Sequence, residues 1–151
     1  MSRIQLALNV SDIDEAVSFY SRMFGVEPAK RREGYANFVI ADPPLKLVLI
    51  ENERDQRLNH LGIEVENSDE VSRAIDRFDT LGFGTEIEER TTCCYAVQDK
   101  VWVRDPDDAR WEVYTVLDDA EEFGSAPADG GDVCCATVNE PVQLTSKPSC
   151  C

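Results

Sequence analysis

The sequence predicts an α+β domain made of two copies of one β-α-β-β-β module. Residues 4–10 and residues 59–65 lie 55 positions apart and share the same order of apolar and polar residues. Each stretch reads as a strand, because apolar and polar residues alternate along it. In both copies a helical pattern follows and stops at a glycine, Gly25 in the first and Gly82 in the second. The chain therefore repeats one folding unit in tandem.

The first module spans about residues 1–52. Ser11 or Asp12 can cap its helix, with Glu15 three residues after Asp12 as in a capping box, and Gly25 ends it. Short apolar runs separated by turns at Glu33-Gly34 and Asp42-Pro43-Pro44 predict three further strands. The expected elements are a strand over 3–10, a helix over 12–24, and strands over 27–32, 35–40 and 45–51.

The second module spans about residues 57–117 and follows a charged linker at 52–56. Its helix is expected to begin at Asn67 or Ser68, which are both good capping residues. The expected elements are a strand over 57–66, a helix over 68–81, and strands over 85–90, 94–104 and 110–117.

Residues 118–151 form a separate segment, rich in Gly, Ala, Pro, Ser and Asp, with little periodic apolar content. Such a composition buries too little surface to offset its ordering entropy, so we expect a flexible tail that the folded core does not need. Four of the six cysteines lie in it, as the adjacent pairs Cys134-Cys135 and Cys150-Cys151, and the third pair is Cys93-Cys94.

Composition excludes several classes of function. A net charge of −15 argues against nucleic acid, whose phosphates would be repelled, and no apolar run approaches the length needed to cross a bilayer. The start of the chain, Met1-Ser2-Arg3, leads directly into a strand rather than a signal peptide, so we expect a cytoplasmic protein. Its thiols would then stay reduced, and paired thiols suit a soft metal or metalloid.

The candidate metal ligands fall at equivalent places of the two modules. The only histidine, His60, lies on the polar face of its strand, and Gln5 takes its place in the first module. Glu112 alternates with the apolar neighbours of the last strand, so it points to the opposite face. Aligning residues 46–48 with residues 111–113 puts Leu47 at the position of Glu112. Three of the four positions can therefore bind a metal and the fourth cannot.

These features resemble the vicinal oxygen chelate superfamily, which includes glyoxalase I, bleomycin-resistance proteins and extradiol dioxygenases. The resemblance covers residues 3–117 and rests on the paired modules, a ligand on the first strand of each, and the D-P-x-x-x-x-W-E pattern from Asp105 to Glu112. It implies a mixed sheet that encloses a metal. Three protein ligands leave positions open for dioxygen and substrate, as in non-haem Fe(II) oxygenases, although Mn, Co or Ni also suits these donors. Gln5 departs from the histidine expected there.

The pair Cys93-Cys94, together with this triad and the cysteine-bearing tail, resembles the carbon–arsenic lyases and cadmium-induced proteins of the superfamily. That resemblance implies Fe(II)- and dioxygen-dependent cleavage of the carbon–arsenic bond in trivalent organoarsenicals such as methylarsenite. Cys93 and Cys94 would hold As(III), and we expect a loop or distorted backbone there, since adjacent strand residues point to opposite faces. The accessory thiols would be the tail cysteines: Cys134, Cys135, Cys150 and Cys151.

Two alternatives stay open at this point. One is a protein of the same fold that sequesters a heavy metal such as cadmium, or an antibiotic, without turnover. The other is an extradiol dioxygenase acting on a catechol, which would explain His60 and Glu112 but not the paired thiols. The two modules could pack within one chain or exchange between the chains of a homodimer.

Overall fold

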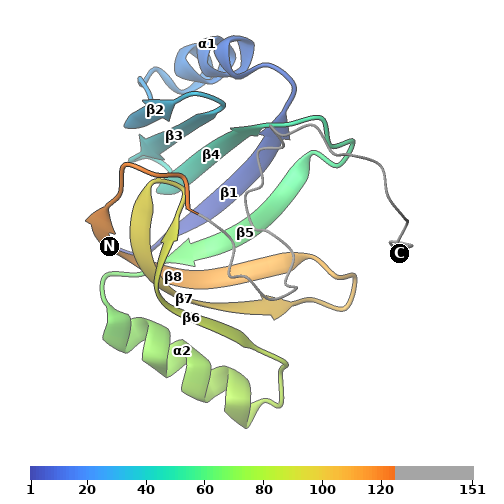
Figure 1. The fold of residues 1–151 in the computed structure, drawn as a ribbon, viewed down its shortest axis with the longest axis vertical. Coiled ribbons are helices and arrows are strands. Elements are labelled where there is room, and N and C mark those ends of the chain that lie inside the picture. Colours follow the sequence, from blue (N-terminus) through green and yellow to red (C-terminus); the bar gives the residue numbers. More distant parts are fainter. Residues whose placement is uncertain (125–151) are drawn as a thin grey trace.

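The computed structural model describes residues 1–124, which form one eight-stranded mixed sheet and two helices (Figure 1). The predicted order of two β-α-β-β-β modules is confirmed. In chain order the elements are β1 (Arg3–Val10), α1 (Ile13–Phe24), β2 (Lys30–Arg32), β3 (Tyr35–Ile40), β4 (Leu45–Glu51), β5 (Leu58–Glu64), α2 (Ser68–Thr80), β6 (Glu86–Cys93), β7 (Ala96–Arg104) and β8 (Arg110–Asp119).

The two modules share the sheet, whose strand order is β2-β3-β4-β1-β5-β8-β7-β6. Within each module the first strand runs parallel to the last, as β1 does with β4 and β5 with β8. Antiparallel pairing of β1 with β5 joins the modules within one chain. The first strands of the two modules, which carry Gln5 and His60, therefore lie side by side at the centre of the sheet.

Both helices begin and end as the sequence predicts, with small differences. The Asp12 side chain accepts a hydrogen bond from the backbone N–H of Glu15, and Gly25 ends α1 in the left-handed conformation. Asn67 rather than Ser68 caps α2, and the helix ends at Thr80, two residues before Gly82. The two helices lie at opposite ends of the curled sheet in Figure 1. None of the helices in residues 1–124 has the length and apolar character to cross a membrane.

The sheet has an apolar face under the helices. On the other side, the polar side, buried polar side chains lie beside an apolar cluster that includes Tyr35, Val48 and Ile50. Val17 of α1 packs against Leu47 and Leu49, and Phe78 of α2 packs in a cluster with Val101 and Val113. The residues that alternate with these strand positions face the polar side, which lines a cavity. The buried polar side chains are Gln5, Asn9, Asn37, His60, Gln98, Lys100, Glu112 and Thr115.

The alignment of Leu47 with Glu112 was wrong by one residue. Leu6 pairs with Leu47 in the first module, and the equivalent pair in the second is Leu61 with Trp111. Glu112 therefore corresponds to Val48, which lines the cavity, whereas Leu47 packs beneath α1. The fourth position is still apolar, so the expectation of three donors does not change.

Candidate functional site

The three predicted ligand side chains converge in the structure. Nε2 of Gln5 lies 2.7 Å from Oε1 of Glu112 and 3.0 Å from Nε2 of His60. The same oxygen of Glu112 lies 3.2 Å from Nε2 of His60. All three side chains are at most 5% exposed. Residues from β1, β5 and β8 therefore meet at one buried point, although they are up to 107 positions apart in the sequence.

The convergence depends on Gly62, which pairs with both Gln5 and Glu112 across the central strands. A Cβ atom at Gly62 would lie 3.1 Å from Cγ of Glu112 and 3.2 Å from Cβ and Nε2 of Gln5. These distances are shorter than ordinary van der Waals contact. A side chain at this position would therefore require Gln5 and Glu112 to shift by a few tenths of an ångström.

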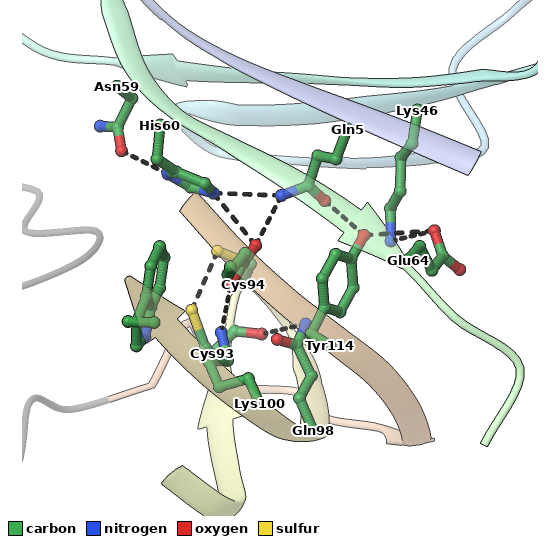
Figure 2. A network of polar contacts seen from close by, with 12 residues as sticks. Gln5, Lys46, Asn59, His60, Glu64, Cys93, Cys94, Gln98, Lys100 and Tyr114 are labelled. Atoms are coloured by element: carbon green, nitrogen blue, oxygen red, sulfur yellow. Dashed lines mark hydrogen bonds and ion pairs between the residues drawn. The ribbon is translucent and has the colours of Figure 1, made fainter. Parts of the chain in front are cut away.

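The cavity around this point has a volume of about 310 Å³. Besides Gln5, His60 and Glu112 it is lined by both thiols of the predicted pair, Cys93 and Cys94. Figure 2 shows the thiols on the far side of the same polar network from His60 and Gln5. A small substrate held by sulfur would therefore share the cavity with the three converging side chains.

A buried lysine sets the charge of Glu112. Nζ of Lys100 lies 3.0 Å from Oε2 of Glu112, and neither side chain is more than 3% exposed. Burial alone would raise the pKa of Glu112, but attraction to the Lys100 ammonium opposes it and the pKa falls to about 2. Glu112 is therefore an anionic donor at neutral pH. Sequence reasoning missed Lys100, which shares one face of β7 with Gln98 and Trp102 and follows the charged Asp99.

Asn59 fixes the orientation of the His60 ring. Its side-chain oxygen lies 2.7 Å from Nδ1 of His60, while its nitrogen donates to the side-chain oxygen of Asn9. Asn9 is held in turn, because it donates to the backbone oxygen of Gln56. With the proton on Nδ1, the lone pair of His60 is on Nε2, which faces Gln5 and Glu112. This arrangement is typical of a metal-binding histidine.

The thiol pair occupies a strained hairpin turn between β6 and β7. Cys94 and Tyr95 both have positive φ, 55° and 62°, in a two-residue turn flanked by the pair Cys93–Ala96. Such turns favour Asn or Gly, and other residues adopt this conformation at a cost. The two Sγ atoms lie 3.2 Å apart. The predicted distortion is therefore present, and it begins at Cys94, directly after β6 ends at Cys93.

Residues after β8 support this turn. The backbone N–H of Cys94 donates to the carbonyl of Phe123, and that of Ala120 donates to the carbonyl of Tyr95. The Phe123 ring packs edge-on against the rings of Tyr35 and Tyr95. We call residues 120–124 the strap. The core thus extends past residue 117, where we expected the flexible tail to begin, because β8 continues to Asp119 and the strap packs on the thiol turn. The four tail cysteines, Cys134, Cys135, Cys150 and Cys151, lie outside the described residues.

The donor set suits a divalent transition metal. An imidazole nitrogen, a carboxylate oxygen and an amide that can offer its oxygen lie within reach of one ion, in a buried place. Nowhere in residues 1–124 do three His, Cys, Asp or Glu side chains gather as a metal site. Gln5 is the side chain beside both His60 and Glu112 that can also offer a neutral oxygen donor.

Comparison with known proteins defines the class to which this fold and site belong. Residues 3–113 match the Glyoxalase/Bleomycin resistance protein/Dioxygenase superfamily. This match covers more than half of the chain, and the chain belongs to that superfamily.

Several curated proteins are similar to this chain over nearly its full length. The cadmium-induced protein CadI of Mycobacterium tuberculosis (strain ATCC 25618 / H37Rv) is 58% identical over 142 residues, which cover 89% of this chain and 93% of CadI. A trivalent organoarsenical cleaving enzyme of Thermomonospora curvata is 52% identical over 142 residues, covering 93% of this chain and 91% of that enzyme. An enzyme of the same name from Bacillus sp. (strain MD1) is 37% identical over 156 residues, covering 100% of this chain and 91% of the relative.

Solved structures agree on the fold. An extradiol ring-cleaving dioxygenase from B. fuscum matches 79% of this chain and 34% of its own, with a TM-score of 0.58 and 21% identity. A Mn(II)-bound glyoxalase from Novosphingobium aromaticivorans matches 81% of this chain and 42% of its own, with a TM-score of 0.58 and 18% identity. At these identities the likeness concerns the fold alone.

Proposed function

We propose that this protein cleaves the carbon–arsenic bond of trivalent organoarsenicals such as methylarsenite, using Fe(II) and dioxygen, and releases arsenite. The observation that carries the proposal is one cavity lined by two adjacent thiols and by three converging donors. The 52% identical relative named as a trivalent organoarsenical cleaving enzyme supports the same reaction. The paired thiols favour this reaction over extradiol cleavage of a catechol, which does not require them.

Gln5, His60 and Glu112 are the residues that would hold the metal. Fe(II) bound there would supply the activation of dioxygen that the reaction needs. Lys100 keeps Glu112 ionised, and Asn59 keeps the Nε2 lone pair of His60 directed at the ion. The same donors would also accept Mn(II), Co(II) or Ni(II), so the ion must be identified by reconstitution.

Cys93 and Cys94 would bind the substrate. As(III) is soft and takes two sulfur ligands, so methylarsenite loses two hydroxyl groups as water when both thiols bind, the two thiol protons leaving with them. The two sulfurs fix the arsenic, and thus direct the methyl carbon into the cavity shared with the donor triad. Much of the rate enhancement would come from this positioning. The thiols must be reduced to do this, which fits a cytoplasmic location.

The overall reaction balances with one dioxygen. Methylarsenite, CH3As(OH)2, and O2 give As(OH)3 and CH2O, so carbon is oxidised, both oxygen atoms are reduced, and the carbon–arsenic bond breaks. A hydroxyl group replaces carbon on arsenic. Gln98 has a buried Oε1 that accepts no hydrogen bond within residues 1–124, and it lines the same cavity. This oxygen is suited to accept a hydrogen bond from the new arsenic hydroxyl.

The experiment that tests the proposal separates metal binding from substrate binding. The protein is reconstituted with Fe(II) without oxygen, methylarsenite is added, air is admitted, and arsenite release and oxygen uptake are measured. We expect His60→Ala and Glu112→Ala to lose turnover with loss of Fe(II). Cys93→Ser and Cys94→Ser should lose turnover but bind Fe(II) as the unmodified protein does, because a hydroxyl does not replace thiolate on As(III). Arsenite release at the unmodified rate by both serine variants would contradict the proposal.

A second candidate is sequestration of a soft metal such as Cd(II) by the thiols, without turnover. It is favoured by the 58% identity to the cadmium-induced protein CadI and by the 3.2 Å separation of the two sulfurs. The same assay distinguishes the two functions. Sequestration predicts tight Cd(II) binding through Cys93 and Cys94, with no oxygen uptake when an organoarsenical is added.

A further inference from the structure

The side-chain amide of Gln5 lies between two different sets of partners. Its Nε2 faces Glu112 Oε1 at 2.7 Å and His60 Nε2 at 3.0 Å, where the proposed metal would bind. On its other side Oε1 accepts a hydrogen bond from the hydroxyl of Tyr114 (Figure 2). A hard or borderline cation binds an amide through oxygen rather than nitrogen. In this structure Gln5 therefore presents its non-coordinating atom to the metal position.

This orientation has a physical reason when no cation is bound. His60 Nε2 and Glu112 Oε1 are both acceptors, and a third acceptor at the same point would be repelled. The NH2 group of Gln5 satisfies both of them. Half a turn of the amide plane exchanges its two ends and brings Oε1 to the metal position with little movement of the chain.

Once the Gln5 amide has turned, its NH2 group faces Tyr114, so Tyr114 must change from hydrogen-bond donor to acceptor. Tyr114 can do so, because a phenol hydroxyl both donates and accepts hydrogen bonds. After the turn the NH2 group of Gln5 donates to the Tyr114 oxygen, and the Tyr114 proton must go to another acceptor. Oε2 of Glu64 lies 3.2 Å from the Tyr114 oxygen and provides that acceptor.

Glu64 is held in place as an ionised acceptor. Arg3 contacts both of its oxygens, at 2.9 and 3.0 Å, and Nζ of Lys46 lies 3.3 Å from Oε2. Its side chain is 17% exposed, so these contacts are largely shielded from solvent. The carboxylate of Glu64 therefore stays at a fixed distance from the Tyr114 hydroxyl, whichever way the amide of Gln5 points.

We propose that Tyr114, backed by Glu64, is the positioning residue that lets the Gln5 amide turn its oxygen toward the metal. Tyr114 donates to Gln5 in this structure, and with a metal bound it would accept from Gln5 and donate to Glu64. The inference rests on the proposed ligation by Gln5 and adds the residues that make an amide usable at this position. It also gives the Arg3–Glu64–Lys46 cluster a role in metal binding.

The test uses Co(II) alone, with binding and visible absorption spectra measured on the full-length protein. Tyr114→Phe, which removes only the hydroxyl, should weaken Co(II) binding about tenfold or more and alter the spectrum. In a Gln5→Ala background the same change should have little further effect, since Tyr114 acts through Gln5. Tyr35→Phe is the matched control: it also removes a buried hydroxyl in the cavity, but one that contacts Asn37.

The outcomes separate this inference from the proposed function. If His60→Ala loses Co(II) while Tyr114→Phe binds it as the unmodified protein does, the positioning role is overturned and the metal site stands. If Tyr114→Phe weakens Co(II) binding equally in the unmodified protein and in Gln5→Ala, Tyr114 acts through packing. That result also overturns the positioning role. If His60→Ala binds Co(II) unchanged, the metal site itself fails.

A comparison of spectra gives a second measurement. Co(II) absorption spectra of Gln5→Ala and Tyr114→Phe should resemble each other, because both variants lack a correctly turned amide oxygen at the ion. A Tyr114→Phe spectrum identical to that of the unmodified protein would show that the Tyr114 hydroxyl does not affect the amide.

Discussion

Nζ of Lys100 and Oε2 of Glu112 lie 3.0 Å apart, and the two side chains are 1% and 3% exposed. Removing one member of such a pair leaves a buried charge without compensation. We predict that Lys100→Met lowers the free energy of unfolding of the metal-free protein by about 3 kcal/mol, measured by urea denaturation. Added Co(II) should restore much of this loss, because the ion neutralises Glu112 in place of the ammonium.

Lys46→Met is the matched control for this prediction. Lys46 also lines the cavity, with its side chain 11% exposed, but its partner Glu64 keeps the two contacts with Arg3. We expect a smaller loss of stability, and one that Co(II) does not restore to the same extent. Equal denaturation midpoints for Lys100→Met and the unmodified protein would contradict the assigned role of Lys100.

Gly62 provides a second prediction, because a methyl group there would press on Glu112 and Gln5 at 3.1–3.2 Å. Gly62→Ala should weaken Co(II) binding about tenfold, an effect comparable to loss of an orienting contact at a metal site. The comparison is Gly84→Ala, since a Cβ atom at Gly84 meets nothing within 4 Å. Titration of both variants with Co(II) checks the expectation, and equal affinities would show that the side chains move aside freely.

The repeat and the converging ligands could be predicted because both depend on strand alternation. Residues 55 positions apart occupy equivalent strands, and alternation sends Gln5, His60 and Glu112 to the face opposite the apolar residues that pack under the helices. The position of Leu47 could not be predicted in the same way. Residues 41–44 precede β4 and residues 105–109 precede β8, so the two turns differ in length and the Asp-Pro pairs do not fix the register of the strands that follow.

Other parts of the site leave little signal in a sequence. A lysine in a strand is usually exposed, so nothing marks Lys100 as buried until its carboxylate partner on a neighbouring strand is known. The strap was missed for a related reason. Phe123 is a single aromatic residue next to an acidic run, and one apolar residue makes no periodic pattern. Its contacts with Tyr35 and Tyr95 depend on the hairpin turn and could not be read from local sequence.

The strap changes what truncation should do. We predict that a chain ending at Gly124 keeps the stability and methylarsenite binding of the whole protein, whereas a chain ending at Leu117 loses about 2 kcal/mol of stability, roughly the contribution of burying one large apolar side chain. It should also bind methylarsenite more weakly, because the Cys94 N–H loses its acceptor on Phe123. Thermal unfolding and competition for methylarsenite by a dithiol measure both effects.

Phe123→Ala in the full-length protein separates the strap from the tail that follows it. This variant should reproduce the weaker methylarsenite binding while Co(II) binding stays unchanged, since the ring contacts Tyr35 and Tyr95 rather than the donor triad. If the chain ending at Leu117 binds methylarsenite as tightly as the chain ending at Gly124, the strap does not position the thiols.

Glu64 gives a prediction about pH. Burial alone would raise its pKa, but hydrogen bonds from Arg3 and attraction to Lys46 lower it below the usual value. A carboxylate with a lowered pKa stabilises the fold above the pKa of the unfolded chain, about 4.3, and this contribution is lost as the pH falls through the lower pKa of the folded state. Glu64→Gln should therefore cost about 2 kcal/mol at pH 7, the size expected for hydrogen bonds to a charged group.

The cost of Glu64→Gln should shrink as the pH falls below about 4.3, because a protonated glutamate resembles glutamine in shape and charge. Urea denaturation of the metal-free protein at a series of pH values measures the difference between the two curves. Glu53→Gln, at an exposed position of the loop between the modules, should follow the unmodified protein at every pH. A difference for Glu64→Gln that stays constant from pH 7 to pH 3 would show that Arg3 and Lys46 do not depend on the charge of Glu64, and the cluster would then give Tyr114 no fixed anionic acceptor.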